Sequence, residues 1–208
     1  MLTALEALAR LKEGNQRFAS GNLRSRDILK TQEGRKQLLA GQAPFAVVIG
    51  CSDSRVPVET IFDQGLGDLF VIRVAGNVVA PSQIGSVEFA AEQFGTRLVV
   101  VLGHTHCGAV NATLQQLQKP VENQSRNLHS IVNRIRPSVE SLLETDLKHD
   151  PKALAKHAIR ANVRVAASHL RYGSEILENM IETDELLVIG AEYSLETGIV
   201  DFFDNVPA

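Results

Sequence analysis

The sequence of 208 residues has no tryptophan, only two cysteines and no excess of charge of either sign. Two cysteines cannot form a disulfide framework, so both thiols are expected to be reduced. The 21 lysines and arginines face 24 aspartates and glutamates, which gives a formal net charge of −3. This balance lacks the basic field that holds a phosphate backbone, so we expect no nucleic-acid partner.

Long apolar segments are also missing. The longest apolar runs, such as that over residues 97–103, fall far short of the roughly 20 residues that span a bilayer, so we expect no membrane insertion. The N-terminus has neither a basic start nor a small-residue cleavage site of the kind that marks an export signal. These absences predict a cytoplasmic protein.

Short and nearly continuous apolar runs are the main structural signal. Such runs are typical of parallel strands covered on both faces, and helical patterns separate them. We therefore predict one α/β domain over residues 1–208, with a central, mostly parallel sheet of four to five strands flanked by helices. The predicted strands are 45–50, 69–74, 98–103 and 186–190, with a short edge strand at 198–203.

Helix signals frame these strands. Thr3 and Glu6 form a capping box that predicts a helix from Thr3 to about Ser20. Further helices are expected over 81–95, from Ser125 to an interruption at Pro137, and from Asp150 to Tyr172.

Two features suggest surface that another copy of the chain buries. Residues 1–42 contain an amphipathic helix with no obvious place in a compact sheet domain, so we predict an N-terminal helical arm that packs on a partner subunit. Phe202 and Phe203, near the C-terminus, add apolar surface. A homodimer, or a higher even oligomer such as a tetramer, is therefore expected.

Polar clusters follow two of the predicted strands directly. Cys51-Ser-Asp-Ser-Arg55 follows the first strand, and His104-Thr-His-Cys107 follows the third. Ligands gather beyond the carboxyl ends of parallel strands, so the two clusters can converge. Thiolates combined with imidazole favour zinc, which takes four ligands in a tetrahedron. Cys51, Asp53, His104 and Cys107 form a sufficient ligand set.

Asp53 and Arg55 lie two residues apart and leave two arrangements open. Asp53 can occupy the fourth zinc position, or it can pair with Arg55 and leave that position to water, as a catalytic zinc site requires. Arginine suits the second arrangement because its planar fork can hold a carboxylate with two hydrogen bonds.

The combination of Cys-Ser-Asp-Ser-Arg with Gly-His-Thr-His-Cys-Gly resembles the β-class carbonic anhydrases, and the resemblance runs from about Gln42 through Ala112. It implies that Cys51, His104 and Cys107 are permanent zinc ligands. It also implies that Asp53 is a gate that either ligates zinc or orients the hydroxide nucleophile, with Arg55 as its partner.

The resemblance also suggests the substrate pocket. It implies that the Gln42 amide binds carbon dioxide or bicarbonate and that Phe70 forms an apolar wall, together with Phe89, where many plant-like members carry tyrosine. Bacterial members with a second, inhibitory bicarbonate site carry tryptophan where this chain has Val48. Arg73 does match an arginine of that second site, and it could equally pair with a neighbouring carboxylate.

The implied activity is zinc-dependent, reversible hydration of carbon dioxide to bicarbonate and a proton. Two alternatives remain open: hydrolysis of carbon disulfide or carbonyl sulfide on the same site, and a non-catalytic, zinc-stabilised module that senses bicarbonate. The presence of Gln42, Asp53 and Arg55 argues against the module, since a structural zinc site needs none of them. A cysteine-dependent phosphatase is excluded because Cys51-x₃-Arg55 is too short for a Cys-x₅-Arg loop.

Overall fold

The computed structural model describes residues 2–24, 36, 38–119 and 125–207. Its centre is a five-stranded sheet in the order β2-β1-β3-β4-β5, in which β5 alone runs antiparallel to its neighbour. The predicted α/β class is confirmed. The strands are β1 (Ala46–Gly50), β2 (Leu69–Arg73), β3 (Leu98–His104), β4 (Leu187–Tyr193) and β5 (Val200–Asp204).

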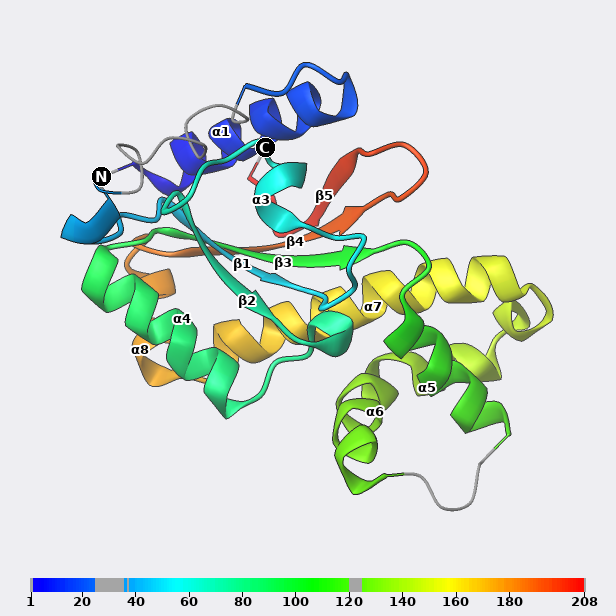
Figure 1. Ribbon diagram of the computed structural model, residues 1–208. Coiled ribbons are helices and arrows are strands. Elements are labelled where there is room, and N and C mark those ends of the chain that lie inside the picture. The colour runs from blue at the N-terminus through cyan, green and yellow to red at the C-terminus, as the bar shows by residue number, and fades with distance from the viewer. Residues whose placement is uncertain (1, 25–35, 37, 120–124, 208) are drawn as a thin grey trace.

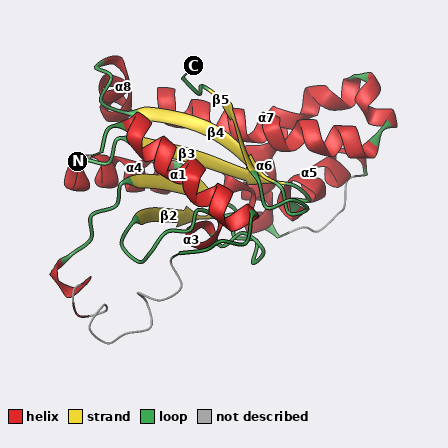
Figure 2. Cartoon of the chain, turned by 90° about the horizontal axis from the view of Figure 1, so that it is seen from above, coloured by secondary structure: helices red, strands yellow, loops and turns green. Residues whose placement is uncertain are grey.

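Helices cover both faces of the sheet, as Figure 1 shows. Helices α1 and α3 lie on one face, and α4, α7 and α8 lie on the other (Figures 1 and 2). Helices α5 and α6 pack with the first part of α7 in a helical lobe beyond the carboxyl end of β3. The helices are α1 (Ala4–Ala19), α3 (Val58–Ile61), α4 (Pro81–Phe94), α5 (Gly108–Gln118), α6 (Arg126–Val139), α7 (Pro151–Tyr172) and α8 (Glu175–Glu182), with short 3₁₀ helices at Leu38–Ala40, Ala75–Asn77, Glu140–Glu144 and Asp146–His149.

The central strands are buried on both faces, which explains why their sequences are apolar without alternation. Every residue of β1 and β3 is buried. Successive residues point to opposite faces, so Val48 joins the core under α1 whereas Val47 joins the core under α4 and α7.

Helix α7 packs closely on the sheet over two glycines. A Cβ atom at Gly103 would lie 2.6 Å from a methyl group of Val163, and one at Gly190 would lie 2.8 Å from the other methyl group. The absence of side chains at these two positions therefore sets the distance between the helix and the sheet. Although α7 has 22 residues, no helix in the described part of the chain is long and apolar enough to cross a membrane.

The expected interruption at Pro137 is wrong, because α6 continues through this residue to Val139. Pro137 lies in the last turn of the helix, where the missing N–H removes a single hydrogen bond close to the natural end. The capping box at the start of α1 is confirmed: the Thr3 hydroxyl accepts from the Glu6 N–H, and the Glu6 carboxylate accepts from the Thr3 N–H.

The N-terminal helix and the C-terminal phenylalanines, which were expected to contact a partner subunit, also make contacts within the chain. Phe202 packs near Phe62, with ring centroids 6.3 Å apart. The Arg160 guanidinium lies over the Phe203 ring, with its carbon 3.9 Å from the ring centroid. The apolar side of α1 covers the sheet through Ala7, Leu8 and Leu11. These segments are therefore partly covered within the chain, and Phe202 and Phe203 remain half-buried. Contact between residues 1–42 and a partner stays a prediction, and 25–35 and 37 lie outside the described residues.

Candidate metal centre

The two chemistry-bearing clusters meet where the sheet changes direction. Strands β1 and β3 are neighbours, but the chain leaves β1 toward β2 on one side and leaves β3 toward β4 on the other. Such a switch point opens a crevice at the carboxyl ends of the two strands. Cys51 directly follows β1, and His104 ends β3.

Three potential ligands converge in this crevice. The ligand atoms of Cys51, His104 and Cys107 all lie within 4.8 Å of one another, and all three residues are buried. Both cysteines are free thiols. Atoms that share one zinc ion lie about 2.0–2.3 Å from it, so the three ligand atoms are close to the spacing that a single ion needs.

The His104 ring is oriented as a metal ligand. Its Nδ1 lies 2.9 Å from the Thr105 carbonyl oxygen, which fixes the proton on that nitrogen. Its Nε2 then carries a lone pair, is buried and has no hydrogen-bond partner among the described residues. A buried acceptor without a partner is costly, and a metal ion beside the two thiols would satisfy it. The residues therefore fit a zinc ion.

The Cys51 thiol is prepared to ionise. A hydrogen bond from Cys107 lowers the pKa of Cys51, with further support from the backbone N–H of Gly76, whose nitrogen lies 3.3 Å from Sγ. The Cys51 thiolate and burial raise the pKa of Cys107. Gly76 adopts φ = 67°, a conformation that favours glycine, and its carbonyl accepts from the Asn162 amide at 2.8 Å.

Asp53 is paired with Arg55. The guanidinium donates to both carboxylate oxygens, at 2.9 and 2.7 Å, and the backbone N–H of Arg55 donates to one of them at 3.0 Å. Arg55 also donates to the His106 carbonyl at 3.3 Å. These bonds hold the pKa of Asp53 well below its usual range. The carboxylate lies beside the ligand group, with Oδ2 3.9 Å from the His104 Nε2.

Arg73 supports the loop that carries Cys51 and Asp53. Its guanidinium donates to the Cys51 carbonyl at 3.1 Å and to the Asp53 carbonyl at 2.6 Å. The suggested pairing of Arg73 with a carboxylate is wrong for the residues that the structure describes, among which Arg73 has no ion pair. Its two bonds to backbone carbonyls hold the turn after β1.

Glu196, which the sequence did not single out, holds the second ligand turn. Its carboxylate lies 2.6 Å from Nε2 of His106 and accepts from the hydroxyls of Thr105 and Ser194 at 2.9 and 3.1 Å. These bonds lower the pKa of Glu196 to about 2, and the bond from Thr105 has the largest effect. His106 has φ = 58°, so the contact secures a left-handed backbone next to Cys107.

The three residues assigned to the substrate lie away from these ligands within one chain. Gln42 is exposed and precedes β1, so it lies near the opposite end of that strand from Cys51. Phe70 pairs in register with Val47, near the beginning of β1. Its ring centroid lies 6.4 Å from that of Phe89, which is 51% exposed on α4. The structure brings the two rings together but does not place them at the metal centre.

Comparisons with known proteins agree with this geometry. The family model for carbonic anhydrase matches residues 46–200. Carbonic anhydrase 2 from Mycobacterium tuberculosis is 37% identical over 196 residues, which cover 94% of this chain and 91% of that protein. A β-carbonic anhydrase from Aspergillus fumigatus has a TM-score of 0.72 at 28% identity, covering 97% and 91% of the two chains. A tetrameric β-carbonic anhydrase from Sordaria macrospora shares the fold, with a TM-score of 0.74 at 23% identity, covering 92% and 93%. The chain belongs to the β-carbonic anhydrase family.

Proposed function

We propose that this chain is a zinc enzyme that interconverts carbon dioxide and water with bicarbonate and a proton. One observation carries the proposal: a buried imidazole nitrogen, without a partner in the described part of the chain, lies close to two free thiols and beside an ionised, arginine-held carboxylate. The first three groups suit a metal, and the fourth suits the orientation of a water molecule. Family membership makes carbon dioxide hydration the general reaction.

Cys51, His104 and Cys107 would hold the zinc ion. When bound, zinc supplies Lewis acidity, which makes water a nucleophile near neutral pH. Two thiolates place more negative charge around the ion than three imidazoles do, and this weakens the acidification. The proposal requires reduced thiols and therefore a reducing compartment, such as the expected cytoplasm.

Asp53 would orient the attacking water. Arg55 keeps this carboxylate ionised, so it can accept a hydrogen bond from the water but is a poor proton carrier. The bidentate contact fixes the direction in which the carboxylate points, and the bond from Arg55 to the His106 carbonyl fixes the guanidinium. The pair thus acts as one positioned acceptor.

We further propose that a second copy of the chain completes the substrate pocket. Gln42, Phe70 and Phe89 are remote from the ligands of their own chain, and the exposed Phe89 ring leaves apolar surface open. A symmetric dimer could place these groups of one subunit over the ligands of the other. The amide would then bind an oxygen of carbon dioxide or bicarbonate, and the two rings would exclude water.

Stopped-flow measurement of carbon dioxide hydration tests the activity directly, with zinc content measured on the same sample. We expect turnover that depends on zinc and is lost on chelation. Hydrolysis of carbonyl sulfide or carbon disulfide in place of carbon dioxide hydration would identify a different enzyme. Full zinc occupancy with neither activity would support a non-catalytic module.

Mixed oligomers test the shared pocket. A chain with Asp53→Ala and a chain with Gln42→Ala are each expected to be impaired as homodimers. If the glutamine acts across the interface, a mixed dimer contains one native site and regains activity. If each chain supplies its own glutamine, no native site forms and mixing restores nothing.

A further inference from the structure

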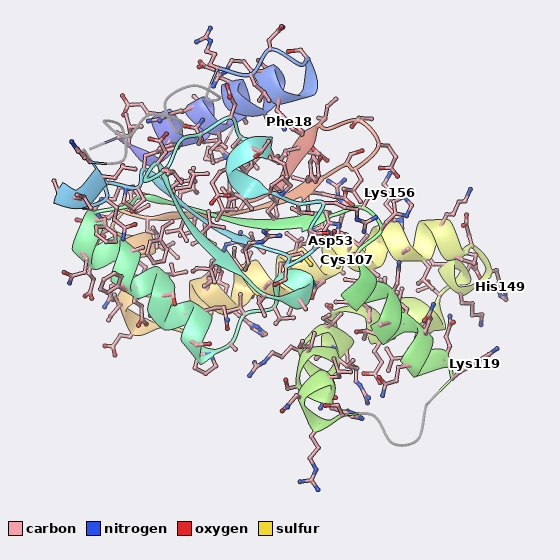
Figure 3. The ribbon with its side chains drawn as sticks, in the orientation of Figure 1. Phe18, Asp53, Cys107, Lys119, His149 and Lys156 are labelled. Carbon is pink, nitrogen blue, oxygen red and sulfur yellow. The ribbon has the colours of Figure 1, made fainter. Side chains whose placement is uncertain are left out.

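A second cavity lies next to the metal centre, between α7, the turn that joins β4 to β5, and the turn after β3. Its volume is about 850 Å³, within the range of small-molecule sites, and Thr105 and His106 of the ligand turn form part of its wall. Figure 3 shows Lys156 on α7 at the same end of the sheet as Asp53 and Cys107. The proposed hydration of carbon dioxide does not use this cavity.

The helical wall of the cavity offers two cations without a partner. Lys152, Lys156 and Arg160 are spaced four residues apart on α7, so they share one side of the helix, and all three line the cavity. Arg160 is paired with Asp201 at 2.8 Å and with Glu192 at 3.5 Å. Neither lysine has an ion pair or a side-chain hydrogen bond among the described residues. Their charge is free to attract an anion.

The opposite wall offers a buried acceptor. Glu192 of β4 lines the cavity but is only 7% exposed, and its Oε1 is buried with no hydrogen-bond partner within the described ranges. Burial raises the pKa of this carboxyl group, with Arg160 and Lys156 acting in the opposite direction. A buried carboxylate oxygen needs a donor, and neither lysine supplies one here. A hydroxyl group of a ligand could supply one once the Glu192 side chain turns to present this oxygen to the cavity.

We propose that this cavity binds a small hydroxylated organic anion, with its phosphate or carboxylate at Lys152 and Lys156 and a hydroxyl group donating to Glu192. The volume argues for an organic ligand, since an inorganic ion would fill only a small part of it. Isoleucine side chains at 159 and 199 in the lining would contact its carbon skeleton.

Calorimetric titration of the zinc-loaded, full-length protein tests the proposal with four probes. Glucose 6-phosphate and gluconate carry both an anion and hydroxyl groups, and their comparison distinguishes a phosphate ligand from a carboxylate ligand. Glucose lacks the anion, and inorganic phosphate lacks the hydroxylated skeleton. We expect saturable binding of glucose 6-phosphate or gluconate, and binding at least about tenfold weaker for glucose and for inorganic phosphate.

Variants locate the binding. Lys156→Gln is expected to weaken it about tenfold or more, whereas Lys119→Gln, an exposed lysine on the helical lobe in Figure 3, should leave it unchanged. Glu192→Gln should also weaken it, because an amide oxygen is a poorer acceptor than a carboxylate. The proposal fails if neither organic anion binds at up to about 10 mM, if inorganic phosphate binds equally well, or if Lys156→Gln has no effect.

Discussion

The carboxylate of Glu196 lies 2.6 Å from the ring of His106, and 90 residues of sequence separate the two. The contact joins the turn between β4 and β5 to the turn that carries Cys107. It also fixes the backbone whose carbonyl accepts from Arg55. The position of the ligand turn therefore depends on a side chain from the far end of the chain.

Replacing Glu196 by alanine should loosen that turn. Residues that orient metal ligands typically contribute about 10–100-fold to metal affinity or activity, and we expect a loss in this range. Zinc affinity by competition with a chelator and kcat/KM for carbon dioxide hydration are the measurements. Glu144→Ala, at an exposed glutamate in the helical lobe, is the matched control. Native zinc affinity in the Glu196 variant would refute the assigned role.

Cys107→Ser should lose most of its zinc, from about one ion per chain, because a hydroxyl is a far weaker ligand than a thiolate. Metal binding contributes folding free energy, so we also expect the free energy of unfolding to fall by about 2 kcal/mol or more. Elemental analysis and denaturant titration measure the two effects. Chelation of the native protein should remove most of the stability difference. Full zinc occupancy in the variant would contradict the ligand assignment.

Activity should depend on pH because water and Asp53 compete for one position on the metal. Arg55 lowers the pKa of Asp53, so the pair persists above the ordinary carboxyl pKa of about 3.9 and is lost as pH falls well below it. Activity should nevertheless rise between about pH 6 and about pH 9, because hydroxide competes better than water for the position that Asp53 could take on zinc. A flat stopped-flow profile over that range would argue against this gate.

Arg55→Lys keeps the charge of this pair but loses the bidentate contact. We expect activity to fall about tenfold or more, equivalent to about 1.4 kcal/mol of lost carboxylate positioning. The measurement is kcat/KM for hydration, with zinc content as the control that the metal is retained. A zinc-loaded variant as active as the native enzyme would show that the fork is not needed.

Gly76→Ala should destabilise the protein and disturb Cys51. The new methyl group would lie 2.8 Å from the Ile135 side chain, at a residue with φ = 67°, so we expect a loss of about 1–3 kcal/mol. Gly85→Ala, inside α4 and without a close neighbour, is the control and should be neutral or stabilising by up to about 1 kcal/mol. Denaturant titration of the zinc-loaded proteins compares them. Equal stabilities of the two variants would contradict this account of Gly76.

Local pattern was sufficient for the sheet and for the convergence of Cys51, His104 and Cys107. Buried parallel strands leave continuous apolar runs, and these three residues lie at or just beyond the ends of two of them. The supports of the site were not predictable in this way. Asn162 reaches Gly76 across 86 residues and Glu196 reaches His106 across 90, and no local spacing reports such contacts.

The contact between Phe203 and Arg160 was hidden for a similar reason. The sequence around Phe203 shows an apolar ring but not the Arg160 guanidinium that lies over it, because that arginine belongs to α7. The predicted interruption at Pro137 was wrong because the sequence did not show where the helix ends. A proline in the last turn disturbs little of the helix, whereas one in the middle would break it.

Helix α7 is a long, stiff element that connects several parts of the molecule. At about 1.5 Å per residue its 22 residues extend roughly 33 Å, well beyond the seven residues of β3. Arg171 fixes one end of the helix to the Val188 carbonyl and Asp204, Val163 rests on the two glycines, and Lys156 projects into the second cavity. A methyl group added at Gly190 would therefore press on the same helix that lines the second cavity and packs in the helical lobe.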